Sequence, residues 1–431
     1  MIASHTRPTS PGPPAPGRSQ LRAGQPAAPP RRRPGGALHA LREDNIRRVL
    51  EVIGIDGGLS QAEVGRRAGL SRATVSNLVA ELRRRGLVRE SPAGPGGRGG
   101  LEVAVAGEGV IVGVDYGDRH VRVGLADLSG RVLAEEVRPL SPDAGLNESC
   151  AEARGLIGRL LDRSGRRRED VLQVGVGLPV PIDTISGRVL WHPLAHGWAE
   201  LDPGAILEEA LQLPVLIDND GNLGALGELR QGAARGLADV IYVNVATRVE
   251  AGFIFAGRLH RGAAGTAGEI GHMTVDPHGQ TCRCGYRGCL DTVVGRSSFL
   301  EPLRDVYGPQ LTMDRVIELA EHGDMRCHRA LSDAGRALGV VIADLCNLLG
   351  PQRVIVAGPI FGAGEIMLGP LRETVEHRAV PAAARAVEIV RSPLDERAEL
   401  LGAMWLALDS VRSRTTGNAL VPEALAVGRA R

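Results

Sequence analysis

The sequence predicts a two-lobed α/β protein preceded by a smaller α+β domain of the winged helix-turn-helix type. Three observations support this fold class. The chain has 431 residues, enough for roughly two to four domains of about 100–200 residues each. Hydrophobic residues make up 43% of it, which is enough to fill cores. From residue 108 onward, strand-like and helix-like runs alternate. The predicted domains are residues 38–106 and residues 108–412.

The charge is unevenly distributed along the chain. Residues 1–107 hold 17 arginines and 8 acidic residues, a net charge of +9, whereas residues 108–431 have a net charge of −8. A basic head on an acidic body predicts contact with nucleic acid; a merely basic, solvated tail is the alternative. No run of about 18 apolar residues is present, which argues against a membrane-spanning helix. Six cysteines and no signal-peptide pattern lead us to expect a reducing cytoplasm.

The two ends of the chain are expected to lack fixed structure. Residues 1–36 contain nine prolines and five glycines, and such a segment cannot bury enough apolar surface to offset its ordering entropy. We therefore expect a disordered extension at residues 1–36 and a flexible tail at residues 413–431.

Residues 38–106 show the pattern of a winged helix-turn-helix. Apolar residues recur at helical spacing between Ile46 and Ile53. A capping-box pattern at Ser60–Glu63 opens a second helix, and Ser71 caps a third. Strand-like runs at 87–90 and 101–105 flank a Gly/Pro-rich tip, which predicts a β-hairpin wing.

The third helix and the wing tip carry the candidate DNA contacts. Small and hydrogen-bonding side chains on the outer face of a helix suit base edges in the major groove, and an arginine at a wing tip suits a minor groove or a phosphate. The predicted DNA-binding residues are Ser71, Arg72, Thr74, Ser76, Asn77 and Arg98. The alternative is a three-helix interaction module that does not bind DNA.

The body of the chain is predicted to contain parallel sheets covered by helices. The strand-like runs are Val110–Tyr116, Val121–Leu125, Val171–Gly177, Pro214–Ile217, Val240–Val245 and Arg353–Ala357. A strand–turn–strand unit opening at Gly113-Val114-Asp115 resembles a second unit that runs from Ile241 to Arg258. Two such halves predict two lobes with a cleft between them.

The sharpest local motif is a set of metal-ligand types. His272 is followed by Cys282-x-Cys284-Gly285-x-x-Gly288-Cys289. Three thiolates and one imidazole complete a tetrahedral Zn²⁺ site without an open position, so the zinc is predicted to be structural. Free buried cysteines and redox-active thiols are the alternatives.

Two further polar clusters are candidates for binding a sugar. The run Asp218–Asn222 directly follows an apolar strand, where carboxylates and amides face the usual ligand crevice. Glu269 can accept hydrogen bonds from vicinal hydroxyls, with His272 shared between zinc and ligand. The predicted sugar-binding residues are Asn219, Asp220, Glu269, His272 and Asp291. An Asx-rich turn and solvated carboxylates are the alternatives.

Together these motifs resemble the ROK family of sugar kinases and repressors, over roughly residues 40–410. The matching residues are Asn219-Asp220, Glu269-Ile270-Gly271-His272 and the three zinc cysteines. The resemblance implies an actin-like, ribonuclease H-like fold of two lobes, and the repressor branch of the family carries an N-terminal winged helix. In active members the residue matching Asp220 is the general base. Asp291 replaces the family's usual Glu.

The phosphate-binding elements of active kinases are altered. The first loop, usually Asp-x-Gly-Gly-Thr, reads Asp115-Tyr116-Gly117-Asp118-Arg119. The second, usually Gly-Thr-Gly-x-Gly, runs from Ala246 to Gly252 with Arg248 and Glu250 inside it. A later Gly-Gly has become Ala357-Gly358-Pro359. Bulky or acidic side chains oppose the close approach of phosphate, so no enzymatic activity is expected and Asp220 is predicted to be a vestigial base.

The sequence therefore predicts a DNA-binding transcriptional regulator, a repressor of carbohydrate uptake or catabolism genes. Its expected partners are operator DNA, a sugar effector and further copies of itself, as a homodimer or homotetramer. One alternative is an active ATP-dependent sugar kinase that keeps a DNA-binding head. Another is a regulator whose cleft is vestigial and whose partner is a protein. The segment His192–Trp198 has lost the family's sugar-contacting Asn, with Leu194 in its place.

Overall fold

The computed structural model describes residues 58–84, 88–92, 101–105, 109–117, 119–141, 146–183, 186–190 and 202–416, and single positions between 42 and 53. The chain divides into two units, Met1–Arg42 and Glu43–Arg431. The predicted extension at residues 1–36, the wing-tip residue Arg98 and the segment His192–Trp198 lie outside the described residues.

The winged helix follows the predicted pattern. Helix α2 (Gln61–Ala68) begins at Ser60, whose Oγ accepts a hydrogen bond from the backbone N–H of Glu63 (3.3 Å), and it ends at Gly69 in a left-handed conformation. Helix α3 (Arg72–Arg84) is capped by Ser71. The strands β1 (Leu59–Ser60), β2 (Val88–Pro92) and β3 (Leu101–Val105) form an antiparallel sheet in the order β1-β3-β2. Helical and strand residues share one apolar core.

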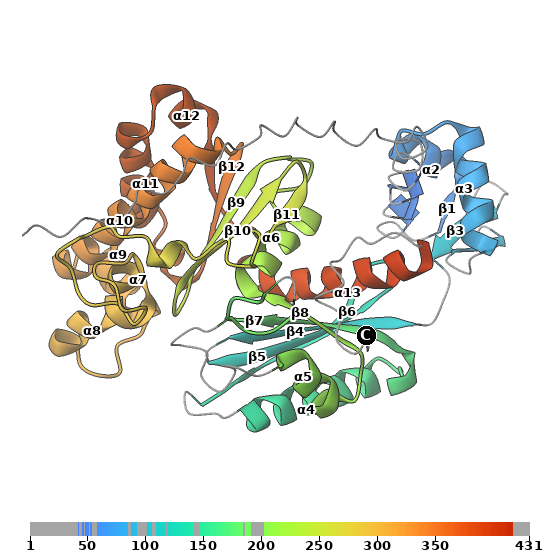
Figure 1. The fold of residues 1–431 in the computed structure, drawn as a ribbon, viewed down its shortest axis with the longest axis horizontal. Coiled ribbons are helices and arrows are strands. Elements are labelled where there is room, and N and C mark those ends of the chain that lie inside the picture. The colour runs from blue at the N-terminus through green and yellow to red at the C-terminus, as the bar shows by residue number, and fades with distance from the viewer. Residues whose placement is uncertain are drawn as a thin grey trace, which may run out of the picture. The chain divides into compact units, whose positions relative to one another are not determined.

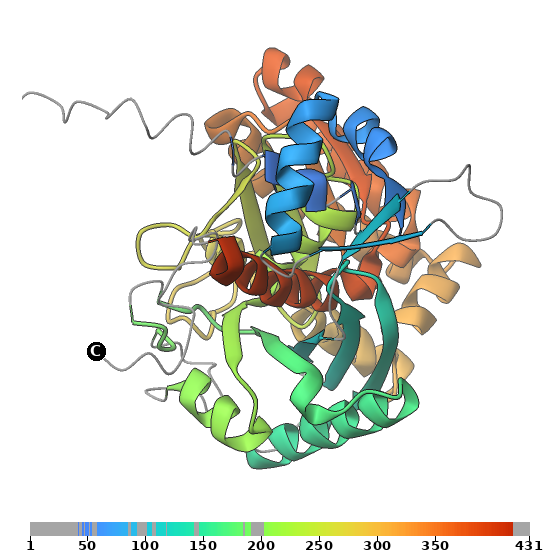
Figure 2. The ribbon, with the colours of Figure 1, turned by 90° about the vertical axis from the view of Figure 1, so that its right-hand side faces the viewer.

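The first lobe is built on a five-stranded sheet in the order β6-β5-β4-β7-β8. Its strands are β4 (Val110–Gly117), β5 (His120–Asp127), β6 (Val132–Pro139), β7 (Val171–Leu178) and β8 (Val215–Asn219). Helices α4 (Leu146–Arg163) and α5 (Pro203–Leu211) cover one face, and α13 (Ala398–Thr416) covers the other (Figures 1 and 2).

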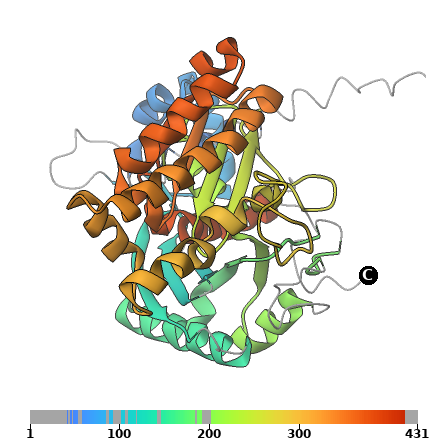
Figure 3. The same ribbon diagram turned by 90° about the vertical axis from the view of Figure 1, so that its left-hand side faces the viewer.

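The second lobe is built on a sheet in the order β11-β10-β9-β12-β13. Its strands are β9 (Val240–Val245), β10 (Val249–Phe255), β11 (Arg258–His260), β12 (Arg353–Ala357) and β13 (Glu388–Arg391). Helices α10 (Met325–Leu349) and α11 (Glu365–Arg378) pack against one face, as Figure 3 shows, and α6 (Asp220–Gln231) packs against the other. The remaining elements are η1 (Arg168–Asp170), η2 (Ile270–His272), α7 (Asp291–Val294), α8 (Arg296–Tyr307), α9 (Met313–Glu321), η3 (Pro359–Ala363), α12 (Pro381–Ala386) and η4 (Asp395–Arg397).

Two sequence-based expectations need correction. The sheets are mixed rather than parallel, because β4, β5 and β6 pair antiparallel, as do β9, β10 and β11. Their connections are short, and a short loop can join only antiparallel neighbours. Moreover, α13 continues through Thr416, beyond the predicted domain end at residue 412. Residues 417–431 lie outside the described part of the chain.

Helix α13 packs closely against α6 and carries a buried glutamate that hydrogen-bonds to the second lobe. At Gly402 it approaches α6 so closely that a Cβ would lie 1.8 Å from the carbonyl oxygen of Leu223. At its first turn, the buried Glu399 accepts hydrogen bonds from the hydroxyl of Tyr242 (2.7 Å) and from Asn244 Nδ2 (3.1 Å), both on β9. Burial, followed by the negative charge of Asp115, raises the pKa of Glu399 to about 8.

We predict that Glu399 makes folding stability fall between pH 5 and pH 8. Because its pKa is higher in the folded than in the unfolded chain, its contribution is complete below about pH 4.5 and is lost as the pH rises through about 8. A Glu399→Gln variant stays neutral. The free energy of unfolding is measured with urea. The difference between the variant and the wild type should shift in favour of the variant by about 1–3 kcal/mol from pH 5 to pH 8. A pH-independent difference would contradict the prediction.

Candidate ligand pocket and metal centre

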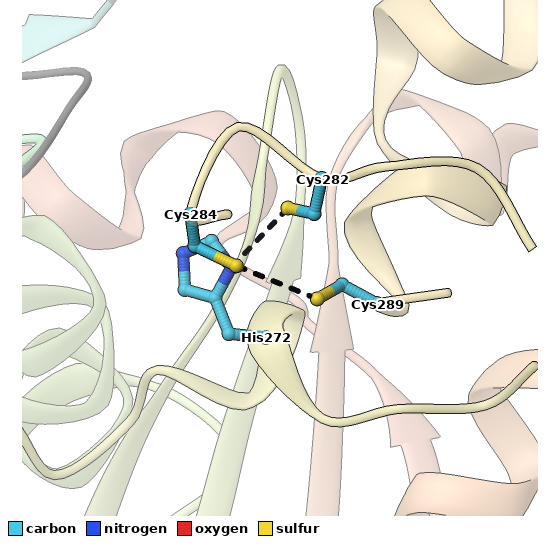
Figure 4. Close-up of side chains that lie close together, drawn as sticks. All are labelled: His272, Cys282, Cys284 and Cys289. Carbon is cyan, nitrogen blue, oxygen red and sulfur yellow. Dashed lines mark hydrogen bonds between the residues drawn. The ribbon is translucent and has the colours of Figure 1, made fainter. Parts of the chain in front are cut away.

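The predicted metal ligands converge on one point. His272 ends η2, whereas the three cysteines lie on the loop that follows, and their side chains turn toward one another (Figure 4). Backbone hydrogen bonds fold this loop: Cys282 N–H donates to the carbonyl oxygen of Tyr286 (2.6 Å). Gly288 has φ 65°, and a Cβ there would lie 1.4 Å from the carbonyl oxygen of Asp276. Only glycine fits this turn.

The geometry of the cluster fits a tetrahedral ion. All four ligand atoms lie within 4.8 Å of one another. The sulfur atoms of Cys284 and Cys289 are 3.6 Å apart, as are His272 Nδ1 and the sulfur of Cys282. Zinc–sulfur bonds of about 2.3 Å place neighbouring sulfurs of a tetrahedron about 3.8 Å apart. Burial and the neighbouring thiols raise the pKa of Cys289 to about 12, and a bound cation would favour its thiolate form.

The pocket beside this cluster contains three of the five predicted sugar-binding residues. Its lining residues among those described are Pro179, Val180, Pro181, Arg248, Val249, Glu250, Glu269, His272 and Asp291. The free volume left among them is about 10 Å³, which is about the space of one water molecule. The pocket is therefore filled by its own side chains.

Glu269, His272 and Asp291 link the pocket to the metal cluster. His272 directs Nδ1 at the cysteines, and its Nε2 lies 3.9 Å from a carboxylate oxygen of Glu269. The buried Asp291 accepts a hydrogen bond from the backbone N–H of Val249 (2.8 Å), which fixes its carboxylate. Burial, then the negative charge of Glu250, raises the pKa of Glu269 to about 7.

Asn219 and Asp220 lie next to this pocket but do not line it. Asn219 caps α6 by accepting a hydrogen bond from the N–H of Asn222 (3.2 Å), as the alternative of an Asx-rich turn leading into a helix predicts. Its amide donates to Asp220 Oδ1 (3.0 Å). Asp220 meets the carboxyl group of Glu250. Burial, then the charge of and the hydrogen bond to Glu250, raises the pKa of Asp220 well above its usual range.

Sequence reasoning missed two residues that dominate the pocket. The sequence indicates that Arg248 and Glu250 are bulky replacements for glycine, but it does not place them in the pocket. The arginine donates from Nε to Glu250 Oε1 (3.2 Å) and from Nη2 to the carbonyl oxygen of Pro179 (2.6 Å). Their side chains are only 9% and 12% exposed. The sequence signal that could have found them is their opposite charge. A buried basic residue is usually paired with an acidic one, and Arg248 and Glu250 are only two positions apart.

The first altered loop is covered by a neighbouring side chain. His120 Nε2 lies 3.0 Å from a carboxylate oxygen of Asp115, and its ring stands over Gly117, where a Cβ would be 2.3 Å from it. Although burial acts against its charge, the hydrogen bond to Asp115 gives a net rise in the pKa of His120. Asp118 lies outside the described residues.

The predicted DNA contacts of α3 lie on its outer face. The side chains of Ser71, Arg72, Ser76 and Asn77 are exposed, and Thr74 is half-buried. The hydroxyls of Ser71 and Thr74 hydrogen-bond to each other (2.8 Å) as part of the helix cap. Arg83 at the helix end pairs with Glu90 of β2 (2.7 Å), which links this helix to the wing.

Comparison with known proteins agrees with this architecture. Residues 111–410 match the ROK family and residues 47–99 match the MarR family. The xylose repressor of Caldicellulosiruptor bescii is 30% identical over 389 residues, which cover 86% of this chain and 97% of that protein. The DNA-binding transcriptional dual regulator NagC of Escherichia coli is 29% identical over 379 residues, covering 85% and 92%.

Solved structures share the fold. A ROK family transcriptional regulator described as a homologue of the E. coli Mlc protein aligns over 90% of this chain and 99% of its own, with a TM-score of 0.71 and 22% identity. A ROK family glucokinase from Streptomyces griseus, solved with glucose and AMPPNP, aligns over 70% of this chain and 100% of its own, with a TM-score of 0.62 and 28% identity.

The fold and the site thus define a two-lobed, sugar-kinase-like protein with a winged helix in front. The chain belongs to the ROK family, since the family match spans more than two thirds of it. Within the described residues, no helix combines the length and the apolar character needed to cross a membrane.

Proposed function

We propose that the protein is a DNA-binding transcriptional regulator, a repressor of carbohydrate uptake or catabolism genes that responds to a sugar bound in the ROK domain. The observation that carries this proposal is the pairing of a winged helix with a complete ROK domain in one chain. Two relatives that align over 86% and 85% of this chain are named as a xylose repressor and as the DNA-binding transcriptional dual regulator NagC.

Helix α3 is proposed to read the operator. Arg72, Ser76 and Asn77 are exposed. The opposite face of the helix packs into the core through Val75, Leu78, Val79 and Leu82. An amide such as that of Asn77 can pair with an adenine edge, and Arg72 with a guanine edge or a phosphate. A dimer or tetramer would place two such helices on a pseudo-palindromic site with half-sites about one helical turn, or a multiple of it, apart.

Replacement of Asn77 by Ala is expected to weaken operator binding about 5–150-fold, the effect of losing about 1–3 kcal/mol of base readout. The measurement is fluorescence anisotropy on DNA from the gene's own upstream region, at fixed salt because phosphate contacts are salt-dependent. Glu373→Ala, an exposed change on α11, is the control. Equal affinities of the wild type and both variants would contradict a role of α3 in DNA binding. Absence of specific DNA binding would contradict the proposed regulator function.

The effector is proposed to act by population shift. A sugar that binds one arrangement of the lobes better than another favours that arrangement, and a coupling of about 1–3 kcal/mol changes operator affinity about 5–150-fold. The same anisotropy assay, titrated with sugars, tests this. Release of DNA by one sugar identifies the effector.

The chain is proposed not to act as a kinase. Burial, and then the neighbouring carboxyl group of Glu250, raises the pKa of Asp220 well above its usual range, which opposes a role as general base. The altered loops also place Arg248 and His120 where a phosphate would need backbone N–H groups. No sugar-dependent ATP consumption is expected. Turnover that Asp220→Asn abolishes would instead establish the kinase.

The metal is proposed to be a structural Zn²⁺ held by His272, Cys282, Cys284 and Cys289. Four protein ligands leave no open coordination position, so the ion would shape the loop rather than take part in a reaction. Glu269 would orient His272 from the far side of the imidazole ring. The loop that carries the three cysteines would in this way fix His272 and Asp291, which line the pocket.

A further inference from the structure

The guanidinium of Arg248 occupies the pocket in which the proposed effector would bind. Arg248 lies in the turn between β9 and β10, in the second lobe, and donates from Nη2 to the carbonyl oxygen of Pro179, which follows β7 in the first lobe (2.6 Å). Its Nε donates to Glu250 (3.2 Å), and the side chain is 9% exposed. Arg248 therefore connects the two lobes through the pocket.

The space that remains cannot hold a sugar. About 10 Å³ is free among the described lining residues, whereas pockets for small ligands usually measure about 300–1,000 Å³. A monosaccharide can therefore enter only when Arg248 gives up its contact with Pro179. The acceptors that Arg248 now uses, the Pro179 carbonyl and the Glu250 carboxylate, would then become available to hydrogen-bond donors of a ligand.

The charges around Arg248 restrict the chemistry of that ligand. The carboxyl groups of Asp220 and Glu250 meet beside it, and those of Glu269 and Asp291 line the same pocket. Oε2 of Glu250 is buried, with no donor bound to it among the described residues. An anionic group placed here would face four carboxyl groups once Arg248 had moved. Sugar hydroxyls, in contrast, donate to such acceptors without adding charge.

We propose that Arg248 is an internal occupant of the effector pocket, and that the effector is an uncharged sugar whose hydroxyls displace it from Pro179 and Glu250. This inference rests on the proposed sugar-responsive function. Displacement has two consequences. The apparent affinity for the sugar is lowered by the fraction of molecules in which Arg248 fills the pocket. In addition, the same step breaks a contact between the lobes, which couples sugar binding to their arrangement.

The test compares Arg248→Ala with the wild type and with Arg258→Ala, an exposed arginine on β11 of the same sheet. Calorimetric titrations use D-xylose, D-glucose, N-acetyl-D-glucosamine and D-glucose 6-phosphate. At least one uncharged sugar is expected to bind to Arg248→Ala about tenfold more tightly than to the wild type or to Arg258→Ala. A tenfold difference corresponds to a pocket that is open in about a tenth of wild-type molecules. Equal affinities, tightest binding of the phosphorylated sugar, or no binding to any protein would overturn the proposal.

A second measurement is independent of the sugar. If Arg248→Ala leaves a cavity facing carboxyl groups, millimolar methylguanidinium should raise the melting temperature of this variant and not that of Arg258→Ala. An equal response of both variants would count against the internal occupant. Arg248→Gln replaces the alanine variant if the latter does not fold.

Operator binding separates this proposal from the function on which it rests. Tighter sugar binding by Arg248→Ala without specific DNA binding by the wild type would support the proposal that Arg248 occupies the pocket. It would overturn the proposal that the protein is a DNA-binding regulator. Specific DNA binding with no effect of the substitution on any sugar would overturn the occupant and leave the regulator.

Discussion

Removal of the metal from the His272/Cys cluster is expected to lower the melting temperature of the ROK domain by about 10–20 °C. Metal-linked folding energies of structural zinc sites are about 10–16 kcal/mol in small peptides. A loss of only about 5 kcal/mol gives this shift, at about 2–4 °C per kcal/mol for a domain of this size class. The effect should be large because Cys282 and Cys289 are buried and their loop also carries Asp291 into the pocket.

The measurement is thermal unfolding with and without a zinc chelator, together with the metal content by mass spectrometry. Cys289→Ala should melt early and should no longer respond to the chelator. Cys346→Ala is the matched control, since Cys346 is equally buried on α10 but lies outside the cluster. Identical melting of the metal-free and metal-loaded protein would contradict the structural role.

The His272/Cys cluster could be predicted because the sequence signal for it is local. His272 and Cys289 are close in sequence, and Gly288 imposes the turn that brings the thiols together. The winged helix was equally accessible, because the capping residue Ser60 and the apolar spacing act within single turns. The strands most apolar in sequence were also found. Strand β6 was missed because all of its residues are half-buried or exposed and several of them are charged.

The filling of the pocket could not be predicted, because it depends on contacts between distant segments. The sequence showed that Arg248 replaces a glycine, but the carbonyl group it reaches belongs to Pro179, in the other lobe. In the same way, nothing near Asp218 in sequence indicates that Arg261 binds it. Such pairs follow from how the two lobes meet, which no local pattern encodes. Asn219 shows the converse, since the helix cap that it forms on α6 follows from its local motif alone.

Arg261→Ala is expected to lower the free energy of unfolding by about 3–5 kcal/mol, the usual effect of leaving one member of a buried ion pair alone. Arg261 follows β11 in the second lobe and donates from Nε (2.8 Å) and Nη2 (2.6 Å) to one carboxylate oxygen of Asp218, at the end of β8 in the first lobe. The other oxygen of Asp218 accepts from Asn222 and from the N–H of Asn219. The Asp218 side chain is 1% exposed, so water cannot replace the guanidinium.

A double-mutant cycle measured by urea unfolding tests this pair. Asp218→Asn alone should also destabilise the protein, but in the Arg261→Ala background it should recover part of the loss, because a neutral amide no longer needs a cation. Arg258→Ala, at an exposed position on the strand that Arg261 follows, should change stability by no more than about 0.5 kcal/mol. Strictly additive losses from the two substitutions would show that Asp218 and Arg261 do not stabilise each other across the lobes. Asp218 directly precedes Asn219, whose amide donates to the carbonyl oxygen of Val180 in the pocket lining (3.4 Å). A true coupling would therefore also mean that this ion pair helps to hold the segment beside the pocket in place.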